Sequence, residues 1–186
     1  MKIPVVGFDP SLRNWGIAQS QLDLETGYLD TPHLTLVCPK DMEGKQVRQN
    51  SHDLHIASQL AEVVIPIAKT AKVIFVEVPV GSQSARAMVS YGVCVGILGA
   101  VRSLGIPLIE VTPTEVKQVF TGNKLATKDE MITQAVSLYP NANFPMFRKE
   151  VSGKAEHVAD AIATIHAGVH TQMFQNLMRL FAGVSP

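Results

Sequence analysis

Three carboxylates stand at positions where the surrounding sequence is apolar. Asp9 ends the first apolar run of the chain, Glu77 ends a run rich in β-branched residues, and Asp160 lies among small helix-forming residues without a nearby Lys or Arg. An ionised carboxylate is costly to bury unless it is paired, so three such acids suggest a shared cation from outside the chain. Oxygen ligands of this kind suit Mg²⁺ or Mn²⁺, whereas zinc would favour more His and Cys.

His157 lies three residues before Asp160, so the two side chains share one face of the expected helix. A lone helical His is usually exposed or hydrogen-bonded within the fold, but beside Asp160 and two further acids we expect a metal ligand or a general base. His166 and His170 form an i,i+4 pair, but they fall roughly opposite His157 and lack the glutamate of an H-E-x-x-H motif. We therefore expect both of them at the surface.

Hydrophobic patterning predicts how strands and helices position these residues. Strands are expected at 3–8, 15–18, 34–37, 73–78 and 106–109. Helices are expected at about 54–67 and 84–104, from the Thr112-Pro113 start, from the Thr127 capping box, and from 156 to about 181. Residues 144–153 are expected to form an irregular loop. This order predicts a single mixed α/β domain over residues 1–186.

Composition narrows the function classes. The chain has 186 residues, 46% of them apolar, and its 16 basic residues balance 16 acidic ones. This balance excludes disorder through self-repulsion and a globally basic surface for nucleic acid. Any nucleic-acid binding would depend on the local basic patch between Lys117 and Lys154.

The cysteines and the apolar stretches indicate in which cellular compartment the protein is expected. Cys38 and Cys94 have no CxxC partner and are expected to be buried, reduced core residues of a cytosolic protein. The N-terminus does not have the pattern of a signal peptide. The longest apolar stretch, 87–101, is shorter than the roughly 20 residues of a membrane span, so no membrane contact is expected.

Three glycines, Gly92, Gly96 and Gly99, recur in the expected helix 84–104. Glycine destabilises a helix interior by up to about 1 kcal/mol, which suggests that another backbone approaches closely, either from the sheet or from a second subunit. The chain contains no P-loop, no G-x-G-x-x-G and no G-x-S-x-G motif. ATP-binding, dinucleotide-binding and serine-hydrolase functions therefore lack their motifs.

Four blocks of the sequence, in order, resemble the RuvC-type Holliday junction resolvases of the RNase H-like nuclease superfamily. Residues 7–16 are similar to the family's first motif, 75–77 to its strand-four glutamate, 116–118 with 127–128 to its DNA-proximal lysines, and 157–163 to its final metal-binding helix. The resemblance spans residues 3 to about 170. It implies an RNase H-like mixed five-stranded sheet, three antiparallel strands and then parallel strands, flanked by helices.

The resemblance also implies a reaction and its residues. Asp9, Glu77, His157 and Asp160 would be the catalytic residues and would hold two Mg²⁺ ions about 4 Å apart, with Mn²⁺ as a substitute. The implied activity is hydrolysis of phosphodiesters in four-way DNA junctions, which leaves 5′-phosphate and 3′-hydroxyl ends. The implied state is a homodimer that nicks two opposed strands, cytoplasmic and DNA-associated, with branch-migration proteins as candidate partners.

Five basic residues are expected to bind DNA: Lys117, Lys128, Arg13, Arg148 and Lys149. Lys117 and Lys128 match the family's two lysines and would steer the backbone into the site. The alternative for both is a solvated helix face.

Two features depart from the family pattern. Residues 78–81 hold no aromatic, where bacterial members carry one that wedges into the junction. Residues 144–149 place aromatics beside cations and could stack on exposed bases instead, or form a hydrophobic plug over the core edge. Three functions stay open: a junction-resolving endonuclease, an RNase H-like nuclease for other branched DNA or RNA–DNA hybrids, and a scaffold that binds branched DNA or another protein without cutting.

Overall fold

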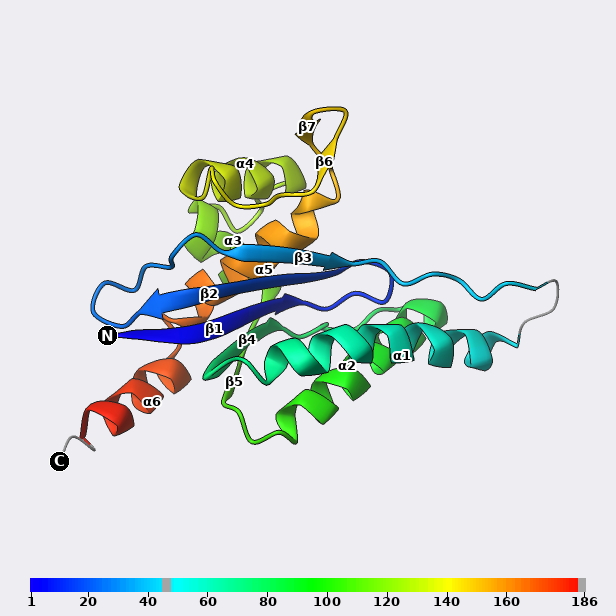
Figure 1. Ribbon diagram of the computed structural model, residues 1–186, viewed down its shortest axis with the longest axis horizontal. Helices are drawn as coiled ribbons and strands as arrows, with labels where there is room; N and C mark the ends of the chain where they lie inside the picture. The colour runs from blue at the N-terminus through cyan, green and yellow to red at the C-terminus, as the bar shows by residue number, and fades with distance from the viewer. Residues whose placement is uncertain (45–47, 184–186) are drawn as a thin grey trace.

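The computed structural model describes residues 1–44 and 48–183, with side chains up to residue 180. Figure 1 shows a central sheet with helices on both sides. The elements in chain order are β1 (Lys2–Asp9), β2 (Trp15–Asp23), β3 (His33–Val37), α1 (Gln49–Ala68), β4 (Val73–Glu77), α2 (Ala85–Arg102), β5 (Leu108–Val111), α3 (Pro113–Thr121), α4 (Lys128–Leu138), β6 (Met146–Phe147), β7 (Glu150–Val151), α5 (Ala155–Gly168) and α6 (Gln172–Gly183).

The main sheet has the strand order β3-β2-β1-β4-β5. β1 pairs with β2 and β2 with β3 in antiparallel register, whereas β4 runs parallel to β1 and β5 runs parallel to β4. The predicted mixed five-stranded sheet is therefore confirmed. The capping boxes at Thr112–Glu115 and Thr127–Glu130 are also present, and they start α3 and α4.

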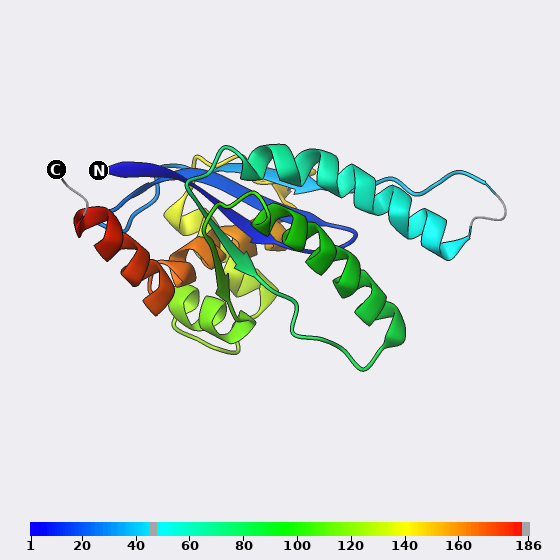
Figure 2. The same cartoon turned by 90° about the horizontal axis from the view of Figure 1, so that it is seen from below.

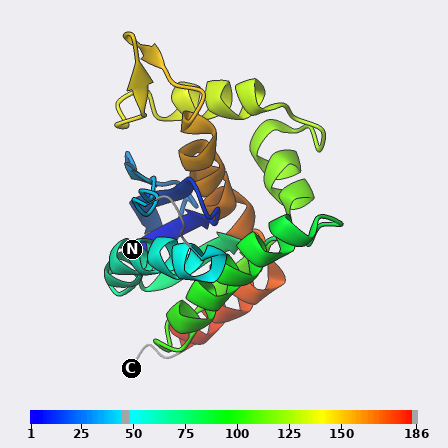
Figure 3. The ribbon, with the colours of Figure 1, turned by 90° about the vertical axis from the view of Figure 1, so that its right-hand side faces the viewer.

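Side chains alternate between the two faces of the sheet, as the strand period of two requires. Val6 and Phe8 of β1 pack with α1 and α2 in one core cluster, whereas Val5 packs with α5 in the other. The views in Figures 2 and 3 show these layers: α1 and α2 cover one face of the sheet, and α5 crosses the other. By the same alternation, Gly7 and Asp9 lie on the α5 face.

Two strand glycines let α5 approach the sheet closely. A Cβ atom at Gly7 would overlap the carbonyl oxygen of Ala161, and one at Gly16 would overlap the carbonyl oxygen of His157. Any side chain at either position would push α5 away from β1 and β2. The two glycines therefore fix how near His157 comes to the end of β1.

The C-terminal part of the chain differs from the expected single helix at 156–181. α5 ends at Gly168, and α6 begins at Gln172. The backbone N–H of Phe174 donates to the hydroxyl of Thr171, 3.2 Å away, so Thr171 caps a new helix. Apolar periodicity continues across this break, which is why the pattern alone did not reveal it.

Other expectations also need correction. Residues 144–153 contain the short β6–β7 hairpin rather than an irregular loop throughout. Cys38 is exposed, and only Cys94 is buried as expected. The first helix begins at Gln49, earlier than its apolar repeat, because its first turn is mostly polar.

The α2 helix is apolar but only partly covered. It packs on the sheet through Cys94, Ile97, Leu98 and Val101. A Cβ atom at Gly92, Gly96 or Gly99 would meet nothing within 4 Å, so the suggestion that these glycines face the sheet is wrong. Of the described residues, α2 alone forms a helix long and apolar enough to cross a membrane, judged by length and composition only.

Candidate metal and nucleic-acid site

Three carboxylates lie near the ends of β1 and β4, close enough to raise one another's pKa values. Phe8 pairs with Val76 in the parallel register, so Asp9 and Glu77 are the next residues along on neighbouring strands. Both lie on the face of the sheet that α5 covers, and α5 supplies Asp160. All three side chains are at least partly buried. The strand ends and one helix therefore bring together acids that are 68 and 83 residues apart in sequence.

Burial and mutual repulsion raise the pKa values of these three acids. Burial, and then the charges of Asp9, Glu77 and Glu156, raise the pKa of Asp160 to about 8. The pKa of Glu77 rises to about 7, mainly through burial and then through the charge of Asp9. Burial also raises the pKa of Asp9, against the lowering effect of its hydrogen bond to His157. A positive charge placed among the three would relieve this repulsion.

His157 lies against the cluster, as its spacing to Asp160 predicts. Its Nδ1 atom is 2.7 Å from Oδ2 of Asp9, and its Nε2 atom is 3.4 Å from a carboxylate oxygen of Glu156. Glu156 is thus a fourth acid beside the site, which the sequence interpretation missed. Its i,i+4 spacing to Asp160 places both on one helix face, and that signal was available.

The two lysines differ in how they face the cluster. Lys117 is partly buried, and its charge lowers the pKa of both Glu77 and Asp160. Lys128 is exposed, and its Nζ atom lies 2.8 Å from the carboxylate of Glu156. Both lysines therefore border the acidic cluster from α3 and α4.

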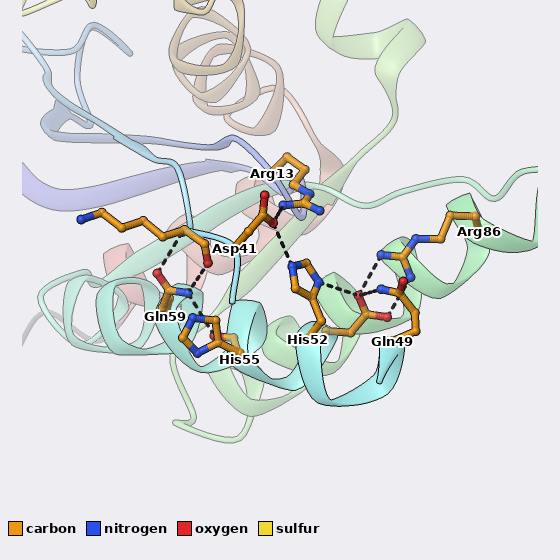
Figure 4. A network of polar contacts seen from close by, with 9 residues as sticks. Arg13, Asp41, Gln49, His52, His55, Gln59 and Arg86 are labelled. Atoms are coloured by element: carbon orange, nitrogen blue, oxygen red, sulfur yellow. Dashed lines mark hydrogen bonds and ion pairs between the residues drawn. The ribbon is translucent and has the colours of Figure 1, made fainter. Parts of the chain in front are cut away.

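The remaining basic residues lie elsewhere. Arg13 forms an ion pair with Asp41, which also accepts a hydrogen bond from His52 at 2.8 Å if that ring nitrogen is protonated. Figure 4 shows this polar network, which continues from His52 toward Arg86. Arg13 therefore faces the beginning of α1 rather than the three carboxylates. Arg148 and Lys149 form the exposed turn of the β6–β7 hairpin.

Residues 144–149 were expected either to stack on exposed bases or to form a hydrophobic plug, and the two aromatics of this segment differ in burial. Phe144 is buried in the core, as a plug would be, whereas Phe147 is 64% exposed. The plug interpretation holds for Phe144 alone, and stacking on bases stays a prediction for Phe147.

The donor set fits a hard divalent cation by its chemistry. It offers carboxylate oxygens and one imidazole, which suit Mg²⁺ or Mn²⁺. Within residues 1–44 and 48–183, no three His, Cys, Asp or Glu side chains are grouped tightly enough to form a metal site as they stand. The shared excess of negative charge, rather than a finished ligand shell, is the observation that favours a cation here.

His166 is not a surface residue, contrary to expectation. Its Nε2 atom is 2.8 Å from the hydroxyl oxygen of Tyr139, and its ring packs 5.2 Å from that of Phe120. Burial lowers the pKa of His166 to about 4. Packing of α3 and α4 over α5 covers it, which the wheel of a single helix cannot show. His170 is exposed, as expected.

Among the comparisons with known proteins, solved structures identify the fold. No protein-family model matches the chain, and a search of curated proteins gives no match. Among solved structures, RuvC of T. thermophilus in complex with a Holliday junction substrate matches with a TM-score of 0.64 and 17% identity, over 89% of this chain and 92% of that one. A second structure of Thermus thermophilus RuvC matches with a TM-score of 0.60 and 20% identity, over 94% and 96%. The chain therefore has the RuvC-type, RNase H-like α/β fold.

Proposed function

We propose that this protein is a metal-dependent DNA endonuclease that resolves four-way junctions. One observation carries the proposal: Asp9, Glu77 and Asp160 converge, desolvated and mutually repelling, at one end of the sheet. A protein that only bound DNA would gain nothing from three acids that repel both one another and the phosphates. The RuvC-type fold and the junction-bound relative support the choice of substrate.

The acidic residues and His157 have distinct proposed roles. Asp9, Glu77, Asp160 and His157 would hold two Mg²⁺ ions, which supply charge stabilisation and a more acidic water when bound. The contact between His157 and Asp9 fixes the orientation of the imidazole ring. The overall reaction adds water across the phosphorus–O3′ bond and leaves a 5′-phosphate and a 3′-hydroxyl.

Lys117 and Lys128 would position the DNA backbone. They border the acids from two helices, so their positive charge would offset the repulsion between the carboxylates and a bound phosphate. Because the whole chain has no net charge, DNA affinity would depend on these local cations together with Arg148 and Lys149. Such contacts release counterions and make binding salt-dependent.

A homodimer through α1 and α2 completes the proposal. These helices border a groove of 570 Å³ lined by apolar residues that include Leu54, Val89 and Val93, and Val89 is 48% exposed. A two-fold partner would cover this face and place two sites on a junction that is itself two-fold symmetric. Val89→Glu should give a monomer by light scattering, whereas Val119→Glu, on the exposed face of α3, should not. A wild-type monomer at micromolar concentration would contradict the dimer.

A cleavage assay tests the function directly. We expect Mg²⁺-dependent, paired nicks in a synthetic four-way junction and none in linear duplex. Asp160→Asn should be inactive, and Asp129→Asn, which removes an exposed acid of α4, should match the wild type. Cutting of forks or RNA–DNA hybrids instead would favour the second nuclease function. Tight junction binding without cutting in Mg²⁺ or Mn²⁺ would favour the scaffold and contradict the proposal.

A further inference from the structure

The β6–β7 hairpin exposes an aromatic ring and two cations at its tip. Phe147 is 64% exposed and Met146 is 59% exposed. The guanidinium carbon of Arg148 lies 5.1 Å from the centroid of the Phe147 ring, which is a cation–π distance. Phe147 belongs to neither core cluster of the described residues, whereas Phe144 at the base of the hairpin is buried. Phe144 therefore contributes to the core, whereas the Phe147 ring is accessible from solvent.

The turn of the hairpin is built from residues that are poorly suited to it. Met146 pairs with Val151 and Phe147 with Glu150, which leaves a two-residue turn. Arg148 and Lys149 have φ values of 49° and 70°, a region that favours Asn and Gly in such turns. Each non-glycine residue there costs roughly 1 kcal/mol. Arg and Lys supply two positive charges that Asn and Gly could not.

The hairpin is tied to the helix that carries the site. The backbone N–H of Ser152 donates to the carbonyl of Pro145 at 2.8 Å, and that of Ala155 donates to Ser152 at 2.8 Å as α5 begins. Figures 1 and 3 show the hairpin projecting from the N-terminal end of α5, beside α4. The stretch from Lys149 to Ala155 can span at most about 20 Å, which is roughly six base steps of DNA at 3.4 Å each.

We propose that the tip of the hairpin is a second DNA contact that recognises unpaired bases next to a branch. Phe147 stacks on an exposed base with the guanidinium of Arg148 beside it, and Lys149 neutralises a neighbouring phosphate. A continuous duplex hides the faces of its bases, whereas a branch point exposes them. The contact thus selects branched DNA for the acidic site on the same helix, α5, from whose N-terminal end the hairpin projects. This inference rests on the proposed function and names the residues behind its substrate preference.

The test compares binding of the full chain, in EDTA, to a four-way junction and to linear duplex. 2-Aminopurine at the branch reports stacking. Phe147→Ala should weaken junction binding about 10-fold, leave duplex binding unchanged and abolish the fluorescence change. Phe147→Trp should restore both. Met173→Ala, which removes an exposed apolar side chain of α6 (60% exposed), is the matched control and should behave as the wild type.

A second variant distinguishes the effect of the two charges on DNA binding from their effect on the stability of the hairpin. Arg148→Asn with Lys149→Gly gives the turn its preferred residues, so its melting temperature should equal or exceed that of the wild type. Its junction binding should nevertheless weaken, and the magnitude of the slope of log K against log salt should fall by about 1, because Lys149 neutralises one phosphate. A poorly folded hairpin cannot explain weaker binding in this variant.

The possible results distinguish a failure of the hairpin proposal from a failure of the proposed function. A wild type that cuts junctions, with Phe147→Ala and the turn variant binding like the wild type, would overturn the hairpin proposal and leave the nuclease intact. A wild type that neither binds nor cuts any branched DNA would contradict the proposed function itself, and the hairpin proposal with it.

Discussion

Buried acids in two regions of this molecule have opposite fates. Asp53 of α1 is only 5% exposed, yet both of its oxygens accept hydrogen bonds from Arg86 of α2, each at 2.8 Å, and the Arg86 contact lowers its pKa. Asp160 of α5 has no cation at hydrogen-bond distance within the described residues, and its pKa rises to about 8. Asp53 is thus paired directly with a cation, whereas Asp160 is not paired with any cation of the described residues.

The difference indicates what each acid does. The pair of Asp53 and Arg86 joins the beginnings of α1 and α2 and is complete in itself. The carboxylates of Asp9, Glu77 and Asp160 lack such a partner. Lys117 lowers the pKa of Glu77 and Asp160, and His157 lowers that of Asp9, but all three pKa values stay raised. A structural acid is expected to be satisfied by its fold. Acids that the fold leaves unsatisfied together point to a partner from outside.

The largest expected effect concerns activity. Asp160→Asn or Glu77→Gln should lower the rate of junction cleavage by about 10³-fold, because several kcal/mol of charge stabilisation depends on the ligands. Since each change removes a repelling charge, the melting temperature of the metal-free protein should stay equal or rise. Gel-based nicking rates and thermal melts would check both. A large loss of stability would show that these acids stabilise the fold, as Asp53 does, and would contradict this prediction.

His166 offers a third case, a buried base that burial keeps neutral. Its pKa falls from 6.5 to about 4. Between these two pH values the imidazole is protonated in the unfolded chain and neutral in the folded chain. Stability is therefore full above pH 6.5 and decreases as the pH falls toward 4, by about 3 kcal/mol in total. His166→Gln should lack this part of the pH dependence. Denaturant unfolding of both proteins at pH 7, 5.5 and 4.5 would show it, and parallel curves would contradict it.

A smaller effect, on the free energy of unfolding, is expected when the ion pair of Asp53 and Arg86 is broken. Breaking a buried ion pair costs about 3–5 kcal/mol, but the side chain of Arg86 is 46% exposed, so Arg86→Ala should cost about 2 kcal/mol. Cleavage rates below the melting temperature should not change. Arg102→Ala, which removes an exposed pair with Glu110, is the control and should cost well under 1 kcal/mol. Equal losses in both variants would remove the distinction between buried and exposed pairs.

The sequence predicts those features that depend on local pattern. Apolar runs that end in an acid predict the positions of Asp9 and Glu77, and the i,i+3 spacing predicts that His157 and Asp160 share a face. The alternation of strands and helices predicts one mixed α/β domain, and the resemblance to the RuvC-type resolvases implies its mixed five-stranded sheet. These predictions succeed because each depends on neighbours within a few residues, or on the general rule that adjacent parallel strands end at one edge.

Features that depend on distant partners were not predictable in the same way. Asp53 and Arg86 are 33 residues apart and meet only because α1 and α2 pack together. His166 is covered by Phe120 of α3 and by Tyr139, which directly follows α4. The β6–β7 hairpin has two-residue strands and a turn without Gly or Asn, so it lacks the usual signals.

The most direct test of the central claim is the stability of the protein in Mg²⁺ and in Mn²⁺, measured by thermal unfolding of the wild type, Asp160→Asn and Arg86→Ala. A site completed by an external cation predicts that the wild type and Arg86→Ala gain stability with metal, by about 2.7 kcal/mol at 100 times the dissociation constant. Asp160→Asn should gain little. Equal responses of all three proteins, or no response in any, would contradict the assignment of Asp9, Glu77 and Asp160 as a metal site.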